Sequence, residues 1–342
     1  MASQVDKLKN RFGITKVVLV GDRGMLTAAR LREDVRPARL DWITALRAPQ
    51  VKALVRGGDL QLSLFDVQDL AEITSPDFPG ERLVACMNPF LAAERARKRE
   101  SLLAATEADL EKIAAACARD RRPLRGQDKI AVRADRVLNR RKVAKHFTVE
   151  ITGDSIRYAR DQDPIAAEAR LDGIYVLRTS AAAGDLGSPE VVSSYKALAQ
   201  VERAFRAFNT DLDIRPIRHR TEDRVRAHVF LRMLSYYLSW HMQARLAPVL
   251  FTDDDKPAAR TSPVAPATRS PRALAKAATK QTPADLPVHS FATLLADLGT
   301  ICLNTIAPAD PALPGFRLVT TPTALQRQAF ELLGVSHRLG VA

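Results

Sequence analysis

The amino-terminal quarter of the chain consists of short apolar runs that end at glycine, proline or aspartate. Residues 16–22 read Lys-Val-Val-Leu-Val-Gly-Asp and predict a strand buried on both faces of a mainly parallel sheet. Asp22 then lies at the carboxyl end of this strand, the edge where open α/β sheets bind ligands. Residues 26–33 predict a short helix, residues 40–46 the next strand, and residues 60–88 further β structure.

The middle of the chain alternates between helical and strand patterns. Residues 94–119 gather apolar side chains near one helical face and predict a long, exposed helix. Residues 146–151 and 155–158 flank a Thr-Gly-Asp turn and predict a β-hairpin. Residues 173–179 predict another strand.

Helical periodicity returns at Ser188, which is followed by proline and glutamate, as is typical of a helix start. This helix is predicted to end near residue 208, with a core face made of Leu198, Val201, Phe205 and Phe208. A second helix is predicted after Thr221. Its residues 225–238 are apolar enough to be largely buried.

Residues 252–288 contain six prolines and no aromatic residue, a composition that cannot bury enough surface to become ordered. We therefore expect a disordered linker there. Beyond it, residues 291–304 and 322–333 predict two helices, the second capped by Thr321.

Composition restricts the class of protein. A chain of 342 residues exceeds the usual size of one domain, and no run approaches the roughly 18 apolar residues of a membrane span. Lys and Arg number 52 against 39 Asp and Glu, an excess of 13 that favours a polyanionic partner, nucleic acid before a membrane surface. Three scattered cysteines lack the spacing of a zinc or redox site, and no signal peptide is evident, so a cytoplasmic protein is expected.

Positive charge is concentrated in two segments. Between Arg119 and Lys145 there are eleven Lys and Arg against three Asp, and this tract is either a solvated helix face or an arm that contacts phosphates. The members that we expect to bind duplex DNA are Arg140, Arg141 and Lys142. The second segment contributes Arg215, Arg218, His219 and Arg220.

Glu202 occupies an unusual position on the helix that begins at Ser188. At about 100° per residue, Tyr195, Glu202 and Arg206 lie together beside the expected core face. A carboxylate at the edge of a buried stripe needs a partner. Either an ion pair with a neighbouring arginine or a metal ion would satisfy it.

Three segments occur in a recognisable order: Val-Leu-Val-Gly-Asp-Arg-Gly-Met (18–25), Leu-Asp-Gly-Ile-Tyr-Val-Leu-Arg-Thr (171–179), and Tyr-Lys-x3-Gln-Val-Glu-Arg-Ala-Phe-Arg (195–206). Together they resemble the DDE transposases of bacterial insertion sequences, in the branch with a β-rich insertion between the second and third acids. The segment Ile-Arg-Pro-Ile-Arg-His-Arg (214–220) and the apolar helix after it also resemble this branch.

The resemblance implies a ribonuclease-H-like α/β core in which Asp22 is the second catalytic acid and Glu202 the third. Such enzymes bind two Mg²⁺ or Mn²⁺ ions that promote cutting and joining of phosphodiester bonds. It further implies that Tyr195, which belongs to the signature helix, and Arg206 contact DNA. Leu198 and Asn209 depart from the family pattern, in which arginine and lysine are expected at these positions.

The first acid of the family lies upstream of the strand that carries the second, and only some sixteen residues precede that strand here. We therefore expect a core that is incomplete at its amino terminus, needs an upstream transposase segment as a partner, and is inactive alone. The expected parts are 1–58 (partial core), 59–187 (β-rich and helical insertion), 188–251 (core helices), 252–289 (linker) and 290–342 (carboxyl-terminal helical segment).

The resulting hypothesis is a DNA transposase that cuts and joins insertion-sequence ends, associated with the bacterial nucleoid in the cytoplasm. Its partners would be duplex DNA at the transposon ends and the target, with self-association as a further expectation. An inactive DNA-binding remnant or inhibitor of transposition is the alternative, and a basic RNA-binding protein is a third interpretation.

Overall fold

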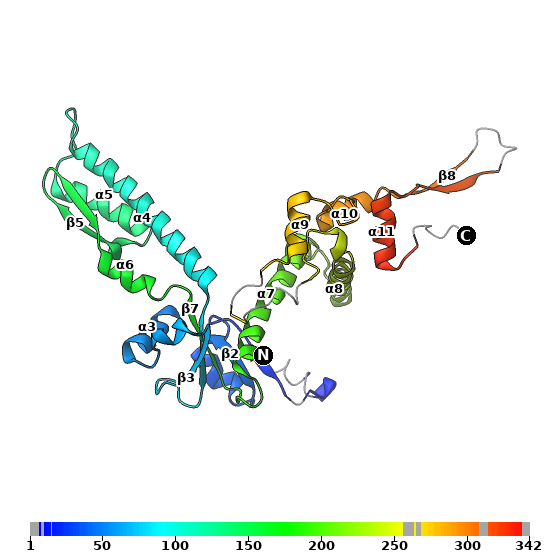
Figure 1. Ribbon diagram of the computed structural model, residues 1–342, viewed down its shortest axis with the longest axis horizontal. Coiled ribbons are helices and arrows are strands. Elements are labelled where there is room, and N and C mark those ends of the chain that lie inside the picture. Colours follow the sequence, from blue (N-terminus) through cyan, green and yellow to red (C-terminus); the bar gives the residue numbers. More distant parts are fainter. Residues whose placement is uncertain are drawn as a thin grey trace. The chain divides into compact units, whose positions relative to one another are not determined.

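The computed structural model describes residue 7 and residues 10–14, 16–255, 263–264, 268–307 and 314–336. The chain folds into two compact units (Figure 1). The first contains residues 1–196 together with 262–265, and the second contains residues 197–261 together with 266–342. None of the described helices is long and apolar enough to cross a membrane.

The first unit is built on a five-stranded sheet in the order β1-β2-β7-β4-β3. Its strands are β1 (Val18–Val20), β2 (Asp41–Ala45), β3 (Leu70–Ile73), β4 (Arg82–Met87) and β7 (Ile174–Thr179). Only β1 and β2 pair in parallel, because the helical segment Ala28–Val35 connects them as a crossover. The other three pairings are antiparallel, so the expectation of a mainly parallel sheet is wrong.

Both faces of this sheet are covered. On one face α3 (Ala48–Gly57) packs through Val51 and Leu54 on a cluster that includes Leu83 and Val176. On the other face Val191 and Val192 of α7 (Ser188–Thr210) pack on a cluster that includes Ile43, Val84 and Leu177. A third cluster joins Trp42 of β2 to Leu26 and to Leu31 and Val35 of the π-helical turn Leu31–Val35, which follows the short helix α2 (Ala28–Arg30).

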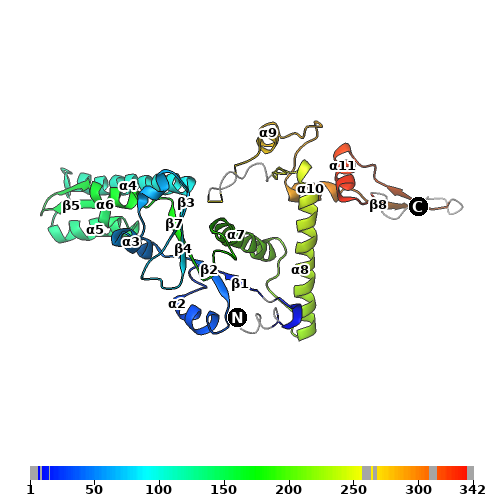
Figure 2. The same cartoon turned by 60° about the horizontal axis from the view of Figure 1, so that its bottom comes forward.

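Between β4 and β7 the chain leaves the sheet and forms an arm with its own core (Figures 1 and 2). The arm contains α4 (Pro89–Cys117), α5 (Gln127–Arg140), β5 (Phe147–Ile151), β6 (Ile156–Arg160) and α6 (Gln162–Ala169). Its core is formed by buried side chains such as Leu103, Leu110, Ile130, Phe147 and Ile156. The long helix and the hairpin expected from the sequence are both present.

The arm joins the sheet at Gly173. This residue has a φ of +80°, and a Cβ added to it would lie 2.5 Å from the backbone oxygen of Asn88. Asn88 caps α4 by accepting hydrogen bonds from the amides of Phe90 and Leu91. The expected division after residue 58 does not follow the sheet, because β3, β4 and β7 of the expected insertion belong to the same sheet as β1 and β2, and β7 pairs directly with β2.

The second unit is mainly helical. It contains the carboxyl-terminal half of α7 and, after it, α8 (Glu222–Arg245), α9 (Pro271–Thr279), α10 (Phe291–Leu298), the hairpin β8 (Leu303–Ile306) and β9 (Phe316–Val319), and α11 (Ala324–Leu333). Its core contains Leu246, Val249, Leu250, Leu294 and Leu325. The expected helix 291–304 ends at Leu298, and Asn304 lies in β8 instead.

The expectation of a disordered linker over residues 252–289 is wrong for the described residues from 268 onward. Ser270 caps α9, and the ammonium of Lys276, 2% exposed, donates hydrogen bonds to the carbonyls of Ala247 and Thr252 and to Asp254. A single buried, fully paired lysine thus anchors a segment whose composition is otherwise typical of disorder. Residues 256–262 and 265–267 of the expected linker lie outside the described residues.

The two long helices are less buried than their sequences suggest. No residue of α8 is buried, and on α7 Val201 is 50% and Phe205 64% exposed, although the pattern predicts both in the core. The apolar periodicity indicates helices correctly, but the assumption that an apolar face is covered by the chain's own core is wrong here.

Candidate functional site

Asp22 follows β1 at the carboxyl edge of the sheet, as expected. Its Oδ1 accepts hydrogen bonds from the amides of Gly24 (3.0 Å) and Met25 (2.6 Å), which form a tight turn around the carboxylate. Gly21 permits this turn, since a Cβ there would lie 2.8 Å from Cγ of the buried Leu26. The turn fixes the direction of an otherwise exposed side chain.

The second oxygen of Asp22, Oδ2, has no hydrogen bond or ion pair among the described residues. A carboxylate with one oxygen held by backbone amides and the other exposed suits a hard divalent cation, which prefers such oxygens. Within the described residues, no group of three or more His, Cys, Asp or Glu side chains is placed to hold a metal ion.

Glu202 is exposed on α7 and makes no ion pair with any described residue. The arginine partner offered as one interpretation of its position is therefore not observed in the described part of the chain. Asp22 belongs to the first compact unit and Glu202 to the second. The family resemblance implies that the two carboxylates face each other, and this stays a prediction.

The other residues of the signature helix lie along α7. Tyr195 is half-buried and packs against the sheet cluster that contains Val84 and Leu177. Arg206, one turn beyond Glu202, is exposed. Its side chain is thus available to solvent from the same helix that carries Glu202.

The basic segment after α7 is held by histidines. The ring of His228 on α8 lies 5.6 Å from that of His219, and its Nε2 is 3.2 Å from the backbone oxygen of Ile214. These contacts attach residues 214–220 to α8 and leave Arg215, Arg218 and Arg220 exposed. The loop therefore presents three guanidinium groups from a fixed backbone.

On the arm, four basic side chains of α5 lie in one line: Lys129, Arg133, Arg136 and Arg140. Their spacing of 4, 3 and 4 residues puts them within about 60° of one another at 100° per residue. All four are exposed and none pairs with an acid in the described structure. The opposite side of α5 is the buried one, with Ile130 and Ala134 in the core of the arm. We call these four residues the α5 ridge.

Other cations of the tract have structural partners. Arg141 forms an ion pair of 2.8 Å with Asp109 and is only 16% exposed, so it joins α5 to α4 rather than facing solvent as expected. Arg125 donates to the carbonyls of Cys117, Leu124 and Asp154. Lys145 pairs with Glu168. Lys142, at the end of α5, remains exposed.

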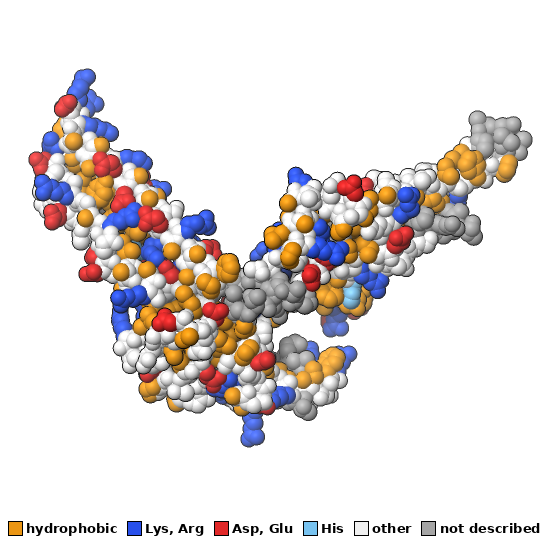
Figure 3. All heavy atoms as spheres, viewed as in Figure 1, with side chains coloured by type: hydrophobic (Ala, Val, Ile, Leu, Met, Phe, Trp, Pro, Cys, Tyr) orange, Lys and Arg blue, Asp and Glu red, His pale blue; other side chains and the backbone are white. Residues whose placement is uncertain are grey.

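Ion pairs brace the arm that carries the ridge. Arg160 of β6 holds the carboxylates of Glu100 and Glu107 on α4 at 2.7–2.9 Å. Lys112 and Arg141 lower the pKa of Asp109 to about 2, so this carboxylate stays ionised well into acid. The arm thus presents its exposed cations from a rigid support, and Figure 3 shows Lys and Arg side chains along it.

Sequence reasoning singled out the tract but not the ridge. The signal was available, because the 4-3-4 spacing of cations within a helical pattern defines one face. Which of these cations form ion pairs with acidic side chains, however, depends on α4 and β6, whose positions relative to α5 are set by tertiary packing.

A family model described as "Transposase DDE domain" matches residues 2–238. No curated protein and no solved structure gives a significant match. The matched range contains Asp22, the arm with its α5 ridge, Tyr195, Glu202 and the loop of residues 214–220. Because it spans well over half of the 342 residues, the chain belongs to the transposase DDE-domain family.

Proposed function

We propose that this chain is a transposase that cuts and joins the ends of an insertion sequence, with Asp22 and Glu202 as the second and third acids of its catalytic triad. The observation that carries the proposal is the carboxylate of Asp22, which a turn holds at a strand end with Oδ2 exposed, in a chain of the DDE family.

Asp22 and Glu202 would together hold divalent cations, Mg²⁺ or Mn²⁺. Bound there, the cations would supply activation of water or a 3′-hydroxyl and stabilisation of the leaving oxygen. The contribution of the chain itself is orientation: two backbone amides fix Asp22, and the rigid helix α7 carries Glu202. We assign the first acid of the family to no residue of this chain.

Duplex DNA would contact the α5 ridge, Lys142, and the exposed Arg206, Arg215, Arg218 and Arg220, with His219 beside them. The lysine and arginine side chains of this set are exposed and form no ion pair within the described residues, as phosphate binding requires. Such contacts position DNA without reading its sequence. Tyr195 would pack the signature helix against the sheet and so set the orientation of Glu202.

The test begins with metal binding, which does not depend on finding the correct DNA. Calorimetric titration should detect binding of Mn²⁺, and Asp22→Asn should lower the affinity for Mn²⁺ at least tenfold. Glu33→Gln is the matched control, since Glu33 is also an exposed carboxylate and among the described residues its ion pair is with its neighbour Arg32. Unchanged Mn²⁺ binding in Asp22→Asn would remove Asp22 from the site.

Activity is measured next on DNA fragments that carry the ends of the element encoding this chain. Cleavage should be lost in Asp22→Asn and in Glu202→Gln. If the protein binds the ends but never cleaves them, the chain is a DNA-binding inhibitor rather than an enzyme.

A further inference from the structure

A two-residue segment from the proline-rich part of the chain is bound to the sheet of the first unit. Pro263 and Val264 belong to this unit, although residues 197–261 and 266–342 belong to the second. Val264 is fully buried in the cluster that also contains Ile43 of β2. We call Pro263 and Val264 the strap.

The strap is held through its backbone oxygens. Nζ of Lys196 on α7 donates a hydrogen bond to the oxygen of Pro263 at 2.6 Å and another to the oxygen of Val264. Nδ2 of Asn88 donates to the oxygen of Val264 at 3.4 Å, while Oδ1 of the same side chain caps α4. An ammonium and an amide thus meet two neighbouring oxygens. These two donors are also of the kind that binds the oxygens of a phosphate.

Two tyrosines lie next to the strap. Tyr175 of β7 and Tyr195 of α7 both pack against the cluster that contains Val264. The hydroxyl oxygen of Tyr175 is buried and has no hydrogen-bond partner among the described residues. A tyrosine hydroxyl can donate to a phosphate, and a tyrosine ring can stack on a base. The groups around the strap are therefore those of a nucleic-acid site.

The strap is bound at the edge of the sheet that also carries Asp22. β1 and β2 are parallel, and the antiparallel pairings β2–β7 and β7–β4 give β4 the same direction as β1. Asn88, which follows β4, therefore lies at the carboxyl edge with Asp22. Three strand spacings of roughly 4.8 Å separate β4 from β1, about 14 Å in all. A DNA strand that rises roughly 3.4 Å per nucleotide covers this distance in about four nucleotides.

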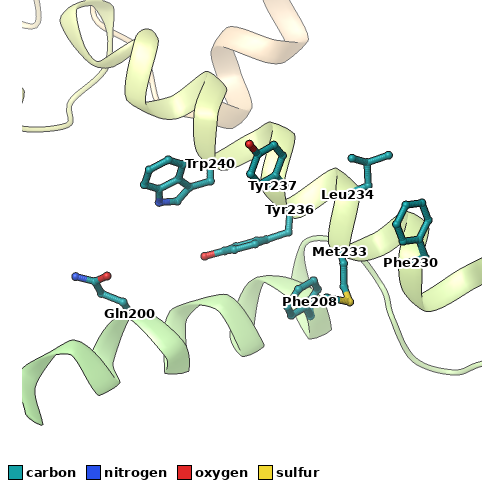
Figure 4. Close-up of a pocket in the computed structure, with 8 residues that line it drawn as sticks. All are labelled: Gln200, Phe208, Phe230, Met233, Leu234, Tyr236, Tyr237 and Trp240. Atoms are coloured by element: carbon teal, nitrogen blue, oxygen red, sulfur yellow. The ribbon is translucent and has the colours of Figure 1, made fainter. Parts of the chain in front are cut away.

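A hollow farther along α7 lacks such donors. It has a volume of about 500 Å³ and lies between α7 and α8, within the second unit. Figure 4 shows aromatic side chains such as Phe208, Tyr236 and Trp240 around it, with the amide of Gln200 on the side of α7. None of the eight described residues that line it is a cation. A phosphate therefore finds better partners at the strap.

We propose that the strap is an internal mimic of a DNA phosphate, which occupies Lys196 and Asn88 until DNA displaces it. This inference rests on the proposed function, since it needs a chain that binds DNA. Displacement is favourable because an ammonium binds an ionised phosphate oxygen more strongly than a neutral carbonyl. It is also reversible, because burial of one valine stabilises the bound strap only modestly. The strap therefore lowers the affinity of the free chain for DNA without blocking it.

Weakening the strap should strengthen DNA binding. Fluorescence anisotropy with a labelled duplex of arbitrary sequence measures the affinity of the full chain. Val264→Ala should bind this duplex about tenfold more tightly, since removal of two buried carbon atoms loosens the strap by that order. Val67→Ala, at a residue 92% exposed, is the matched control and should leave the affinity unchanged. Circular dichroism checks that both variants are folded.

Substitution of Lys196 distinguishes the strap from simple surface charge. In the original chain Lys196→Met should change the affinity by less than about twofold, because it removes a phosphate contact and loosens the competing strap at once. In the Val264→Ala background it should weaken binding about tenfold, because no strap remains to offset the lost contact. Lys16→Met removes the charge of an exposed lysine of the same unit and should have one small effect in both backgrounds.

Hydrogen exchange observes the displacement directly. The peptide that contains Val264 should exchange faster when the duplex is added at saturation, while β7 stays protected. A strap that remains protected with DNA bound would overturn the proposal, and so would equal effects of Lys196→Met in the two backgrounds. Binding of duplex that Val264→Ala leaves unchanged would overturn the strap alone. Absence of duplex binding in every variant would overturn the proposed function as well.

Discussion

Arg178 of β7 occupies the most enclosed cationic position in the sheet. Its guanidinium lies between the rings of Trp42 and Phe78, 4.9 and 5.1 Å from their centroids, and binds both oxygens of Glu81 at 2.6–2.7 Å. The side chain of Glu81 is only 5% exposed, and its second partner, Arg36, approaches from solvent. Glu81 is thus a buried carboxylate whose charge is compensated mainly by one buried residue, Arg178.

Replacing Arg178 by leucine should lower the free energy of unfolding by about 3 kcal/mol, since it leaves a buried carboxylate with only a solvent-exposed partner. Urea denaturation measures the change. Arg32→Leu is the control, because Arg32 is 74% exposed and its pair with Glu33 should contribute under about 1 kcal/mol. Equal effects of the two substitutions would contradict this account.

His146 makes the arm sensitive to pH. Burial lowers the pKa of His146, and the nearby Lys145 and Arg99 act in the same direction, while Glu168, 2.8 Å from Nε2, opposes them. A lowered pKa means that the unfolded chain takes up a proton at higher pH than the folded one. Stability is therefore complete above the unfolded value of about 6.5 and declines as the pH falls through it.

We expect the urea midpoint to fall between pH 7.5 and pH 5.5, and we expect His146→Gln to remove part of this decline. The comparison isolates His146, because the remaining histidines are common to both proteins. Identical pH profiles would show that His146 keeps its ordinary pKa. A midpoint that rises in acid would reverse the sign and point to the pair with Glu168 as dominant.

At the scale of single elements, the α5 ridge gives a prediction about DNA. Replacing Lys129, Arg133 and Arg136 by glutamine should weaken binding to every duplex alike. It should also make the dependence of log K on log salt less steep by about 2–3, because each phosphate that a cation no longer neutralises reduces this slope by roughly 0.9. Fluorescence anisotropy at several salt concentrations measures both quantities.

Arg125→Gln and Arg141→Gln are the matched controls, because they remove positive charge from the same tract at positions already held by backbone carbonyls and Asp109. They should affect the stability of the arm and leave the salt slope nearly unchanged. If the ridge variants keep the slope of the original protein, DNA binds elsewhere.

Helices and hairpins with a local signal could be predicted from the sequence. Ser188 and Pro189 begin α7, and the Thr-Gly-Asp turn joins β5 to β6, whereas α4 begins at Pro89, five residues before the expected start. The helix α9 could not be predicted, since its order depends on Lys276 reaching carbonyls 24 and 29 residues away. Exposure of the apolar side chains of α8 could not be predicted either, because periodicity identifies an apolar face but not what covers it.

At the scale of the whole molecule, the candidate site was only half predictable. The strand-and-turn position of Asp22 follows from its neighbours in sequence, and the structure agrees. Its relation to Glu202 does not, because 202 − 22 = 180 residues separate them and they belong to different compact units. Family membership, rather than any local pattern, supports joining them in one site.

Val264 belongs to the first compact unit, whereas most of its neighbours in sequence belong to the second. It is fully buried in the sheet cluster with Ile43 and Val192, and its backbone oxygen accepts hydrogen bonds from Lys196 and Asn88. Val264→Ala should therefore lower the free energy of unfolding by about 2 kcal/mol, through the cavity it leaves. Val67→Ala, at a residue 92% exposed, should have no measurable effect.

The position of Val264 also restricts how the protein can be divided. The chain passes from one unit to the other after residues 196, 261 and 265. A fragment that stops at residue 196 would lack Val264, which is buried in the core of its sheet. A fragment that starts at residue 197 would contain Val264 without the sheet on which it packs. A single nick next to Val264 would leave two pieces that each contain part of both units. Deletion mapping with one breakpoint would then disrupt both units at once, although the protein has two compact units.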